Sequence, residues 1–310
     1  MAYSQGGKID AYDYNSFILG VNGTIDSIRT FWGNGFPAYG RYGYGQPAIS
    51  TVAAGSTVTA TQWATMINAL NNARLHQTGN ATAFSSTGMT AGSKINYIGD
   101  FYTTIVATFY AGPNFASQGT TTTGSNFTTA IGGTTGINSY IERTVTFSSY
   151  EQVRFFFNAG GQLNLALSTS GSNGTGSSSS FGRLITGLGG VGLYNTQNTG
   201  RTGTGITLNT NDTSIGYYDM LFNTNTNIVQ VTDTTASYTA STGYIGVYAG
   251  EAFPSAEYGM GRIVKFRIGY NIADKTWDDT LGITLNSRVD IVFPETTYLT
   301  NSWSGAITIT

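Results

Sequence analysis

The segment spanning residues 151–167, EQVRFFFNAGGQLNLAL, constrains the fold more than any other part of the chain. Large apolar side chains occupy every second position in both of its halves. They are Val153, Phe155, Phe157, Leu163, Leu165 and Leu167. A short connection, Asn158-Ala-Gly160-Gly161, joins the halves. Two alternating runs around a Gly-rich connection predict an antiparallel hairpin with one apolar face.

Alternating runs recur through residues 99–310. The candidate strands cover residues 101–110, 141–147, 151–158, 162–168, 214–222, 228–232, 244–248, 262–270, 288–293 and 306–310. Short strands separated by turn-rich segments predict a mainly β fold, an antiparallel β-sandwich or jelly roll, rather than an α/β fold. Two Ser/Thr/Gly-rich segments, 170–180 and 195–205, contain almost nothing that can be buried, and we expect surface loops there.

The first eighty residues carry a helical pattern instead. An apolar stripe steps by three and four residues along one side of a predicted helix. Its members are Tyr14, Ile18, Val21, Ile25, Ile28 and Trp32. A second helix is predicted over residues 60–76, with an N-cap at Thr59 or Thr61 and Gly79 just beyond its end. We therefore expect a two-helix module over residues 1–80, a polar linker over 81–98 and the sandwich over 99–310.

Composition limits the partners of such a protein. Only 10% of the residues are charged, against about 25% in an ordinary soluble protein. The formal net charge is −2, and the cations are scattered, which argues against nucleic-acid binding. The absence of cysteine excludes disulfides and thiolate metal sites. The sequence shows no signal peptide and no long apolar run, so we expect synthesis in a cytoplasm and no membrane partner.

Each reactive pattern has a structural explanation. His76 is the only histidine, at a predicted helix end where a partly protonated ring would interact with the last carbonyls. The Gly-rich pattern at 187–192 does not precede a helix, as a dinucleotide site requires. Asp274, Asp278 and Asp279 are poorly spaced for a glycosidase pair. Residues 209–212 match only half of a calcium loop. We predict no catalytic residue, cofactor or metal.

The loop over residues 36–46 is rich in tyrosine. Tyr39, Tyr42 and Tyr44 could stack on sugars or pack against a neighbouring subunit, and the abundance of tyrosine in the chain favours packing. Together with the helical stripe they are the candidate interface residues.

Two of these segments together resemble a known class of proteins. TATQWATMINALNNARLHQTG (59–79), preceded by YGYGQ (42–46), is similar to the amino-terminal region of virion structural proteins of tailed phages, notably cyanophages and related marine myophages. VRFFFNAGGQLNL (153–165) resembles their central motif, and ADKTWDDTLG (273–282) similarly precedes the last strands. The resemblance implies no catalytic residues. It implies structural roles for Trp63 and His76 in a helix, and for Asn158, Gly160 and Gly161 in the hairpin.

The resemblance implies a non-enzymatic virion component. We expect it in the tail (fibre, baseplate or collar), with other virion proteins as partners and a homo-oligomeric trimer or ring as its assembly. A head decoration protein is the nearest alternative. A module that recognises host surface glycans through the β domain, and a depolymerising enzyme, are the alternatives of other classes. If residues 1–80 form an attachment module, their deletion should abolish incorporation into particles and leave residues 99–310 folded.

Overall fold

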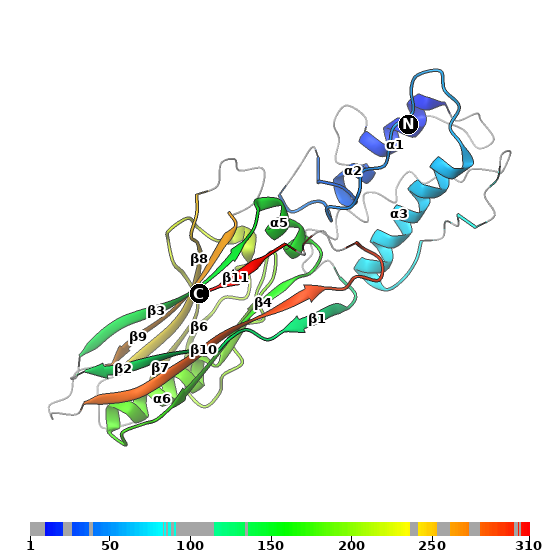
Figure 1. Ribbon diagram of the computed structural model, residues 1–310. Helices are drawn as coiled ribbons and strands as arrows, with labels where there is room; N and C mark the ends of the chain where they lie inside the picture. The colour runs from blue at the N-terminus through cyan, green and yellow to red at the C-terminus, as the bar shows by residue number, and fades with distance from the viewer. Residues whose placement is uncertain are drawn as a thin grey trace.

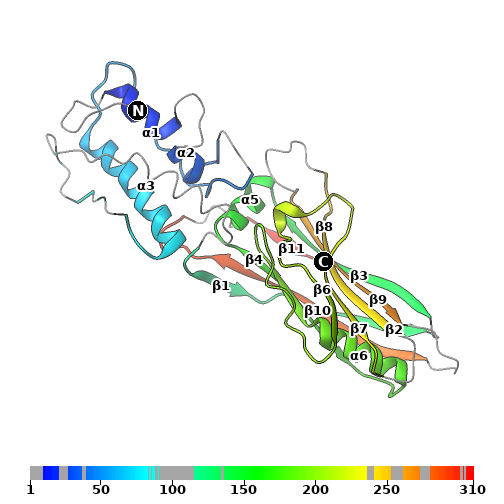
Figure 2. The ribbon, with the colours of Figure 1, turned by 180° about the vertical axis from the view of Figure 1, so that it is seen from behind.

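The protein is elongated, with the amino-terminal helices at one end and two β-sheets, with their own helices, at the other (Figure 1). The structure, a computed structural model, describes residues 10–20, 27–36, 40–82, 84, 86–87, 90, 115–133, 136–235, 241–252, 261–272, 280–300, 303 and 305–310. The view from behind shows the same separation of the amino-terminal helices from the sheets (Figure 2). The predicted mainly β architecture, a sandwich-like pair of sheets preceded by helices, is confirmed.

The helical module contains α1 (Ala11–Leu19), α2 (Ile28–Phe31) and α3 (Ala60–Thr78). Helix α3 was predicted correctly: Thr59 and Gln62 form a capping box at its start, and Gly79 closes it at a φ of 73°. The first predicted helix is not continuous. Helix α1 ends before Gly20, which has a φ of 78° that a helix cannot continue through. Val21 and Ile25 lie outside the described residues.

One sheet is built around a long central strand, β10 (Leu281–Pro294). Its other strands are β1 (Gln118–Thr122), β2 (Phe127–Gly133), β4 (Gln162–Ser170) and β5 (Gly190–Leu193). Strands β1 and β2 pair with successive parts of β10, and β4 pairs with β10 and β5. Leu163 and Leu165 of β4 lie opposite Ile291 and Val289 of β10. All these pairs are antiparallel.

The second sheet has six strands in the order β11-β3-β9-β8-β7-β6. They are β3 (Ile137–Phe147), β6 (Thr207–Asn211), β7 (Thr226–Asp233), β8 (Ser241–Ala249), β9 (Ile263–Ile272) and β11 (Ile307–Ile309). Five of the predicted strands overlap strands of this sheet, and two more, 162–168 and 288–293, overlap β4 and β10 of the first sheet. In β9 the side chains alternate between buried and partly exposed, as expected for a strand that covers a core. The candidate strand 101–110 lies outside the described residues.

The predicted hairpin over residues 151–167 is wrong in its first half, which forms helix α5 (Tyr150–Asn158). Ser149 caps this helix by accepting a hydrogen bond from the Gln152 amide. Val153, Phe156 and Phe157 repeat with helical spacing and are buried on the sandwich. Gly160, at a φ of 91°, follows the last turn. The glycine pair therefore ends a helix rather than turning a hairpin.

Three other predictions are corrected by buried side chains. Residues 214–222 do not form a strand but contain a 3-10 turn, η1 (Tyr217–Asp219), whose Tyr217 ring stacks on Phe157 at 4.5 Å between centroids. The predicted loop 170–180 contains the first turn of helix α6 (Gly176–Leu188), capped by Thr175. In the other predicted loop, Asn195 and Asn198 are buried. Short polar side chains can be buried where backbone groups bond them.

Helices α5 and α6 each pack against both sheets. The Phe156 ring contacts Phe147 of β3 and Phe293 of β10. On α6, a buried stripe packs against β4, β7, β8 and β10. Its apolar members are Phe181, Leu184, Ile185 and Leu188. Burying each of these large side chains stabilises the fold by about 1.5–3 kcal/mol. The two helices are therefore part of the sandwich core.

Candidate functional site

The end of the sandwich nearest the helical module is organised by Arg154 of α5, which has no exposed side-chain surface. Its Nη1 donates to the carbonyl of Tyr42 at 2.7 Å and its Nη2 to the carbonyl of Asn34 at 2.8 Å. Glu151, one turn earlier, accepts from Nη2 at 2.5 Å. A buried guanidinium needs such partners because an unpaired charge is costly away from water. Arg154 thus binds the backbone of the amino-terminal loop to α5.

Asn158, at the end of α5, binds the same loop. Its side-chain amide donates toward the carbonyls of Gly40, Tyr42 and Gly43 at 2.8–3.0 Å. Its side-chain carbonyl accepts from the Tyr218 hydroxyl at 2.9 Å. Asn158 was predicted as a hairpin-turn residue, and the structure places it in a buried network between the helical module and the sandwich. Neither period-two nor helical spacing signals such a role.

His76 extends this joint from α3. Its Nε2 lies 2.9 Å from the carbonyl of Ala159, to which the neutral ring donates, and its ring packs edge-on against Tyr44. Burial lowers the pKa of His76 to about 4. The expected partly protonated ring at a helix end is therefore corrected: the imidazole is neutral at pH 7 and bonds a different segment. Arg154, Asn158, His76 and their partners are called the joint below.

Close packing around the joint also explains why glycine occupies positions 160 and 161, the two glycines that were predicted as structural residues. A Cβ on Gly160 would lie 2.1 Å from the Phe115 ring, and one on Gly161 would lie 2.6 Å from the Phe156 ring. Trp63, the other predicted structural residue, is buried in the helical module, with its ring 5.5 Å from that of Phe17. These positions are required by packing within the chain.

Most of the predicted interface residues are not at the surface. The buried members are Tyr14, Ile18, Ile28, Tyr42 and Tyr44. They pack inside the module because its three helices need an apolar core of their own. Tyr39 lies outside the described residues. Of the described candidates, only Trp32 keeps a partly exposed ring.

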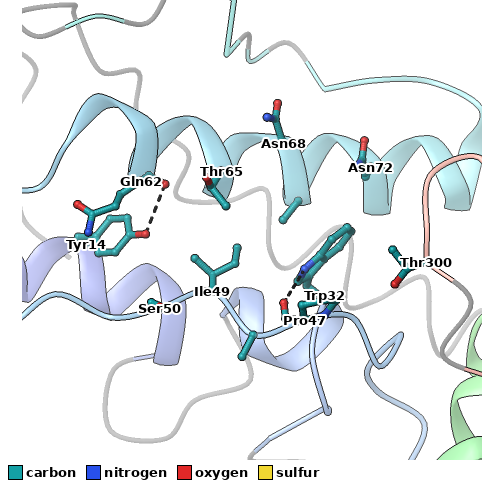
Figure 3. Close-up of a pocket in the computed structure, with 12 residues that line it drawn as sticks. Tyr14, Trp32, Pro47, Ile49, Ser50, Gln62, Thr65, Asn68, Asn72 and Thr300 are labelled. Atoms are coloured by element: carbon teal, nitrogen blue, oxygen red, sulfur yellow. Dashed lines mark hydrogen bonds between the residues drawn. The ribbon is translucent and has the colours of Figure 1, made fainter.

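Trp32 lines a groove in the helical module, and Asn34 of the joint lines part of the same groove. A pocket of about 500 Å³ lies between Trp32, the segment from Pro47 to Ser50, and α3. Figure 3 shows Trp32 between Ile49 and Thr300, with its ring extending toward α3. A second pocket of about 300 Å³ shares Trp32, Ala48 and Ile49. We call these adjoining pockets the Trp32 groove.

Helix α3 supplies a polar wall to this groove. The lining side chains recur every three or four residues, which places them on one helix face. They are Gln62, Thr65, Asn68, Ala69 and Asn72. The sequence pattern pointed to Trp32 only as a member of an apolar stripe, and it gave no signal for Asn68, Asn72 or Thr300. Thr300 comes from the far end of the chain, where Gln46 bonds its amide and hydroxyl.

The charged side chains on the sandwich are mostly paired. Glu142 accepts from Arg267 at 2.7 Å and also bonds Tyr248, while Lys265 lies 3.6 Å away. Burial opposes ionisation of Glu142, but the bonds from Tyr248 and Arg267 outweigh it and hold its pKa below the ordinary value. These are partly exposed pairs, close to the surface kind that contributes about 0–1 kcal/mol. They form no catalytic pair of carboxylates.

Other candidates for chemistry gain no support. Asp274, Asp278 and Asp279 lie outside the described residues. Gly187–Gly192 runs from the end of α6 into β5, the reverse of the order that a dinucleotide site needs. In the described part of the chain, no three His, Cys, Asp or Glu side chains gather in a metal-binding group. Among the helices described, none is long and apolar enough to cross a membrane.

Comparisons with models of protein families, with curated proteins and with solved structures gave no match to this chain.

Proposed function

We propose that this protein is a non-enzymatic structural component of a tailed-phage particle, associated with the tail and attached through its helical module. The resemblance of residues 42–46, 59–79 and 153–165 to virion proteins supports the class of protein. The observation that carries the mechanical role is the joint. It fixes the helical module to the sandwich through buried, directional hydrogen bonds, so that an attached module would hold the sandwich in one orientation.

The surface of α1 is the proposed contact with the particle. Helix α1 lies in the helical end of the molecule, away from the sandwich (Figures 1 and 2). Tyr12 and Leu19, two turns apart on this helix, are 69% and 38% exposed. Large apolar side chains near each other on one helix face are typical of protein contacts. These two residues, rather than the buried stripe, are the interface candidates that the structure offers.

Deletion of residues 1–80 does not test this role cleanly. The deletion removes the carbonyls of Asn34 and Tyr42 that Arg154 binds, so the remaining chain would lose stability along with its module. The earlier expectation that residues 99–310 fold unchanged without residues 1–80 is therefore revised. A surface variant that leaves the joint intact separates attachment from folding.

The test uses Tyr12→Asp in a phage that encodes this protein. We expect the wild-type chain to be found in purified particles by quantitative mass spectrometry and located on the tail by antibody labelling. Tyr12→Asp should lower its copy number several-fold because a charge would be buried at the contact. Leu208→Asp is the matched control, since Leu208 is 41% exposed on β6 of the sandwich.

Two results would contradict the proposal at different levels. Absence of the wild-type chain from purified particles would remove the virion role altogether. If Tyr12→Asp is incorporated as well as the wild type and Leu208→Asp are, the protein is still a virion component, but α1 is not its attachment surface. Circular dichroism and the unfolding midpoint of each purified variant check that the fold is retained.

A further inference from the structure

One long side of the sandwich ends in two edge strands, β2 and β3. In the described part of the chain, β2 pairs only with β10, and residues 137–143 of β3 pair only with β9. The two strands lie side by side, because the Ile137 side chain adjoins Gly133 and Arg143 donates to the Thr129 hydroxyl at 3.4 Å. Both extend to the end of the sandwich farthest from the helical module (Figures 1 and 2). We call this side of the sandwich the open side.

Every second residue of β2 directs its backbone groups away from β10. The carbonyl of Gly282 in β10 accepts from the Asn173 amide, and its N–H donates to Ser178, so Gly282 faces the β4 side. Backbone direction alternates along a strand, so the odd-numbered residues of β10 near Gly282 face β2 and bond their odd-numbered partners there. The even-numbered residues of β2 therefore direct their N–H and C=O groups outward. They are Thr128, Ala130 and Gly132.

Strand β3 has a matching set of outward backbone groups. Thr144 exchanges both backbone hydrogen bonds with Thr310, which follows β11 on the side away from β9. Residues 138, 140 and 142 have the same parity as Thr144, so their N–H and C=O groups point to that same outer side. No described strand pairs with them there. Tyr140 is the middle residue of this set, as Ala130 is of the set in β2.

The other sheet edges in the described part of the chain are protected against pairing. Strands β1 and β6 each have a register shift, and β11 has only three residues. On β5, the carbonyls of Gly190 and Gly192 accept from the amides of Thr202 and Thr199. Natural sheets use such bulges, short strands and covering segments to prevent edge-to-edge contact. Strand β2 instead pairs regularly with β10 and contains neither a charge nor a proline, so its edge can accept a further strand.

Side chains on the open side also leave apolar surface uncovered. Tyr140 is 51% exposed on the outer face of its sheet. Ile137 and Ile141 face the core with the same parity as Val145, yet they are only partly buried, whereas Val145 is fully buried. A strand added at this edge would bury apolar surface on both faces of the sheet.

We propose that the open side pairs with the open side of a second copy of this chain, across a twofold axis that passes beside Ala130 and Tyr140. An antiparallel strand pair is symmetric about such an axis. Thr128 would lie opposite Gly132 of the second copy, and the outward N–H groups of each strand would meet outward C=O groups. Both sheets would then continue from one copy into the other.

The side chains that meet across this axis are compatible. The two Tyr140 rings would lie next to each other, which is a favourable cross-strand contact. Glu142 would lie opposite Asn138 of the second copy, so like charges do not oppose each other. Arg143 points inward and already bonds Ser287 at 2.6 Å and the carbonyl of Glu142 at 2.8 Å. It can therefore be covered without losing these partners.

An extended peptide from another protein is the alternative occupant of an open edge. One peptide would cover one strand and leave the neighbouring edge open. Two edges that lie side by side, with their centres at matching positions, favour a second copy of the chain. This assembly goes beyond attachment to the particle, and it differs from the trimer or ring that the resemblance implies.

The first experiment is analytical ultracentrifugation of the purified full-length chain over a range of concentrations. We expect a reversible dimer. Ala130→Lys places two positive charges opposite each other at the axis and should weaken dimerisation about tenfold or more. Leu208→Lys is the matched control, since Leu208 is 41% exposed on β6, at the other edge of the second sheet. It should dimerise as the wild type does.

The second experiment uses single cysteines to find which residues meet at the axis, because the chain has no cysteine of its own. Ala130→Cys and, in a separate variant, Tyr140→Cys should each give a disulfide-linked dimer on mild oxidation. Residues directly opposite each other in an antiparallel pair are close enough for a disulfide. Leu208→Cys should remain largely unlinked.

Four results would each overturn the proposal. The wild type stays monomeric at about 100 μM, where a pair with a micromolar Kd is mostly dimeric. It forms a trimer. Ala130→Lys folds and leaves the dimer unchanged. Neither open-side cysteine cross-links more than Leu208→Cys does.

Circular dichroism checks that each variant keeps its fold. If Ala130→Lys does not fold, the cysteine variants still decide the question. Dimerisation is measured on the free protein, so its failure would leave the proposed virion role unaffected.

Discussion

Helices α5 and α6 have the same relation to the sandwich and different relations to the rest of the molecule. Each packs large apolar side chains against both sheets, Phe156 and Phe157 from α5 and Phe181 and Leu184 from α6. Helix α6 has a partly exposed outer surface on which Arg183 pairs with Asp233. Helix α5 is covered on its outer side by the amino-terminal loop, which Arg154 and Asn158 bind.

The difference shows how one kind of helix can close a core or join two modules. Apolar packing alone tolerates small rotations because it is not directional. Buried hydrogen bonds to particular carbonyls do not, because misalignment leaves polar groups unpaired. The joint at α5 therefore fixes the orientation of the helical module, whereas α6 needs only to complete the core.

The sharpest comparison is between the arginines of the two helices. Arg154→Met should lower the free energy of unfolding by about 3–5 kcal/mol, since the carbonyls of Asn34 and Tyr42 lose their charged donor in a buried site. Arg183→Met should cost less, about 1–3 kcal/mol, because the Arg183 side chain is 36% exposed and the buried Asp233 keeps its bonds from Ser180 and from the Thr235 amide.

Urea unfolding of both variants measures this difference. Arg154→Lys is a further variant, which keeps the charge but cannot reach two carbonyls in a fork, and it should fall between wild type and Arg154→Met. Equal losses for Arg154→Met and Arg183→Met would mean that the joint depends on its arginine no more than the half-buried Arg183–Asp233 pair does.

The joint should also give the protein a pH dependence that the α6 end does not share. Burial holds the pKa of His76 at about 4 in the folded protein, below the ordinary 6.5. Between these values the unfolded chain binds more protons than the folded one, so stability falls as the pH is lowered. From pH 7 to pH 5 the loss should be about 2 kcal/mol.

Because His76 is the only histidine, one variant isolates this effect. His76→Gln can still donate to the carbonyl of Ala159 and has no ionisable group. Its urea midpoint should change much less between pH 7 and pH 5 than that of the wild type. A drop of the same size in both proteins would show that the pH dependence does not come from His76.

The same comparison shows what the sequence could predict. Strands such as β9 and helix α3 were predicted because their burial patterns follow a single period over many residues, with α3 also marked by its caps. Helix α5 was missed because VRFFF satisfies both periods: Val153, Phe155 and Phe157 alternate, while Val153, Phe156 and Phe157 follow a helix. The pair Ser149 and Gln152 was a capping signal that favoured the helix.

The candidate site was less predictable than the fold. Trp32 and the Tyr42–Tyr44 region were named, but burial depends on which segments meet in three dimensions. Asn72 and Thr300 are far apart in sequence, and only the fold brings both to Trp32. Likewise, the sequence alone places Arg154 at the polar position of an amphipathic segment. Only the structure shows that Asn34 and Tyr42 cover it.

The smallest expected effects compare one glycine from each helix. Gly160→Ala should destabilise the protein by about 1–3 kcal/mol, because the backbone has a φ of 91° and the new Cβ would lie 2.1 Å from Phe115. Gly182→Ala should stabilise it by about 0.5–1 kcal/mol, since this residue is inside α6 and its nearest neighbours, Ile283 and Thr169, are 3.8 Å away.

Thermal midpoints of the two variants give the signs directly. Opposite signs would mean that glycine ends α5 for a geometric reason, whereas α6 tolerates glycine at a cost in helix propensity. A destabilising Gly182→Ala would indicate that α6 packs too tightly to accept a methyl group. The distinction between α5, which binds the helical module, and α6, which completes the core, would then depend on the arginine variants alone.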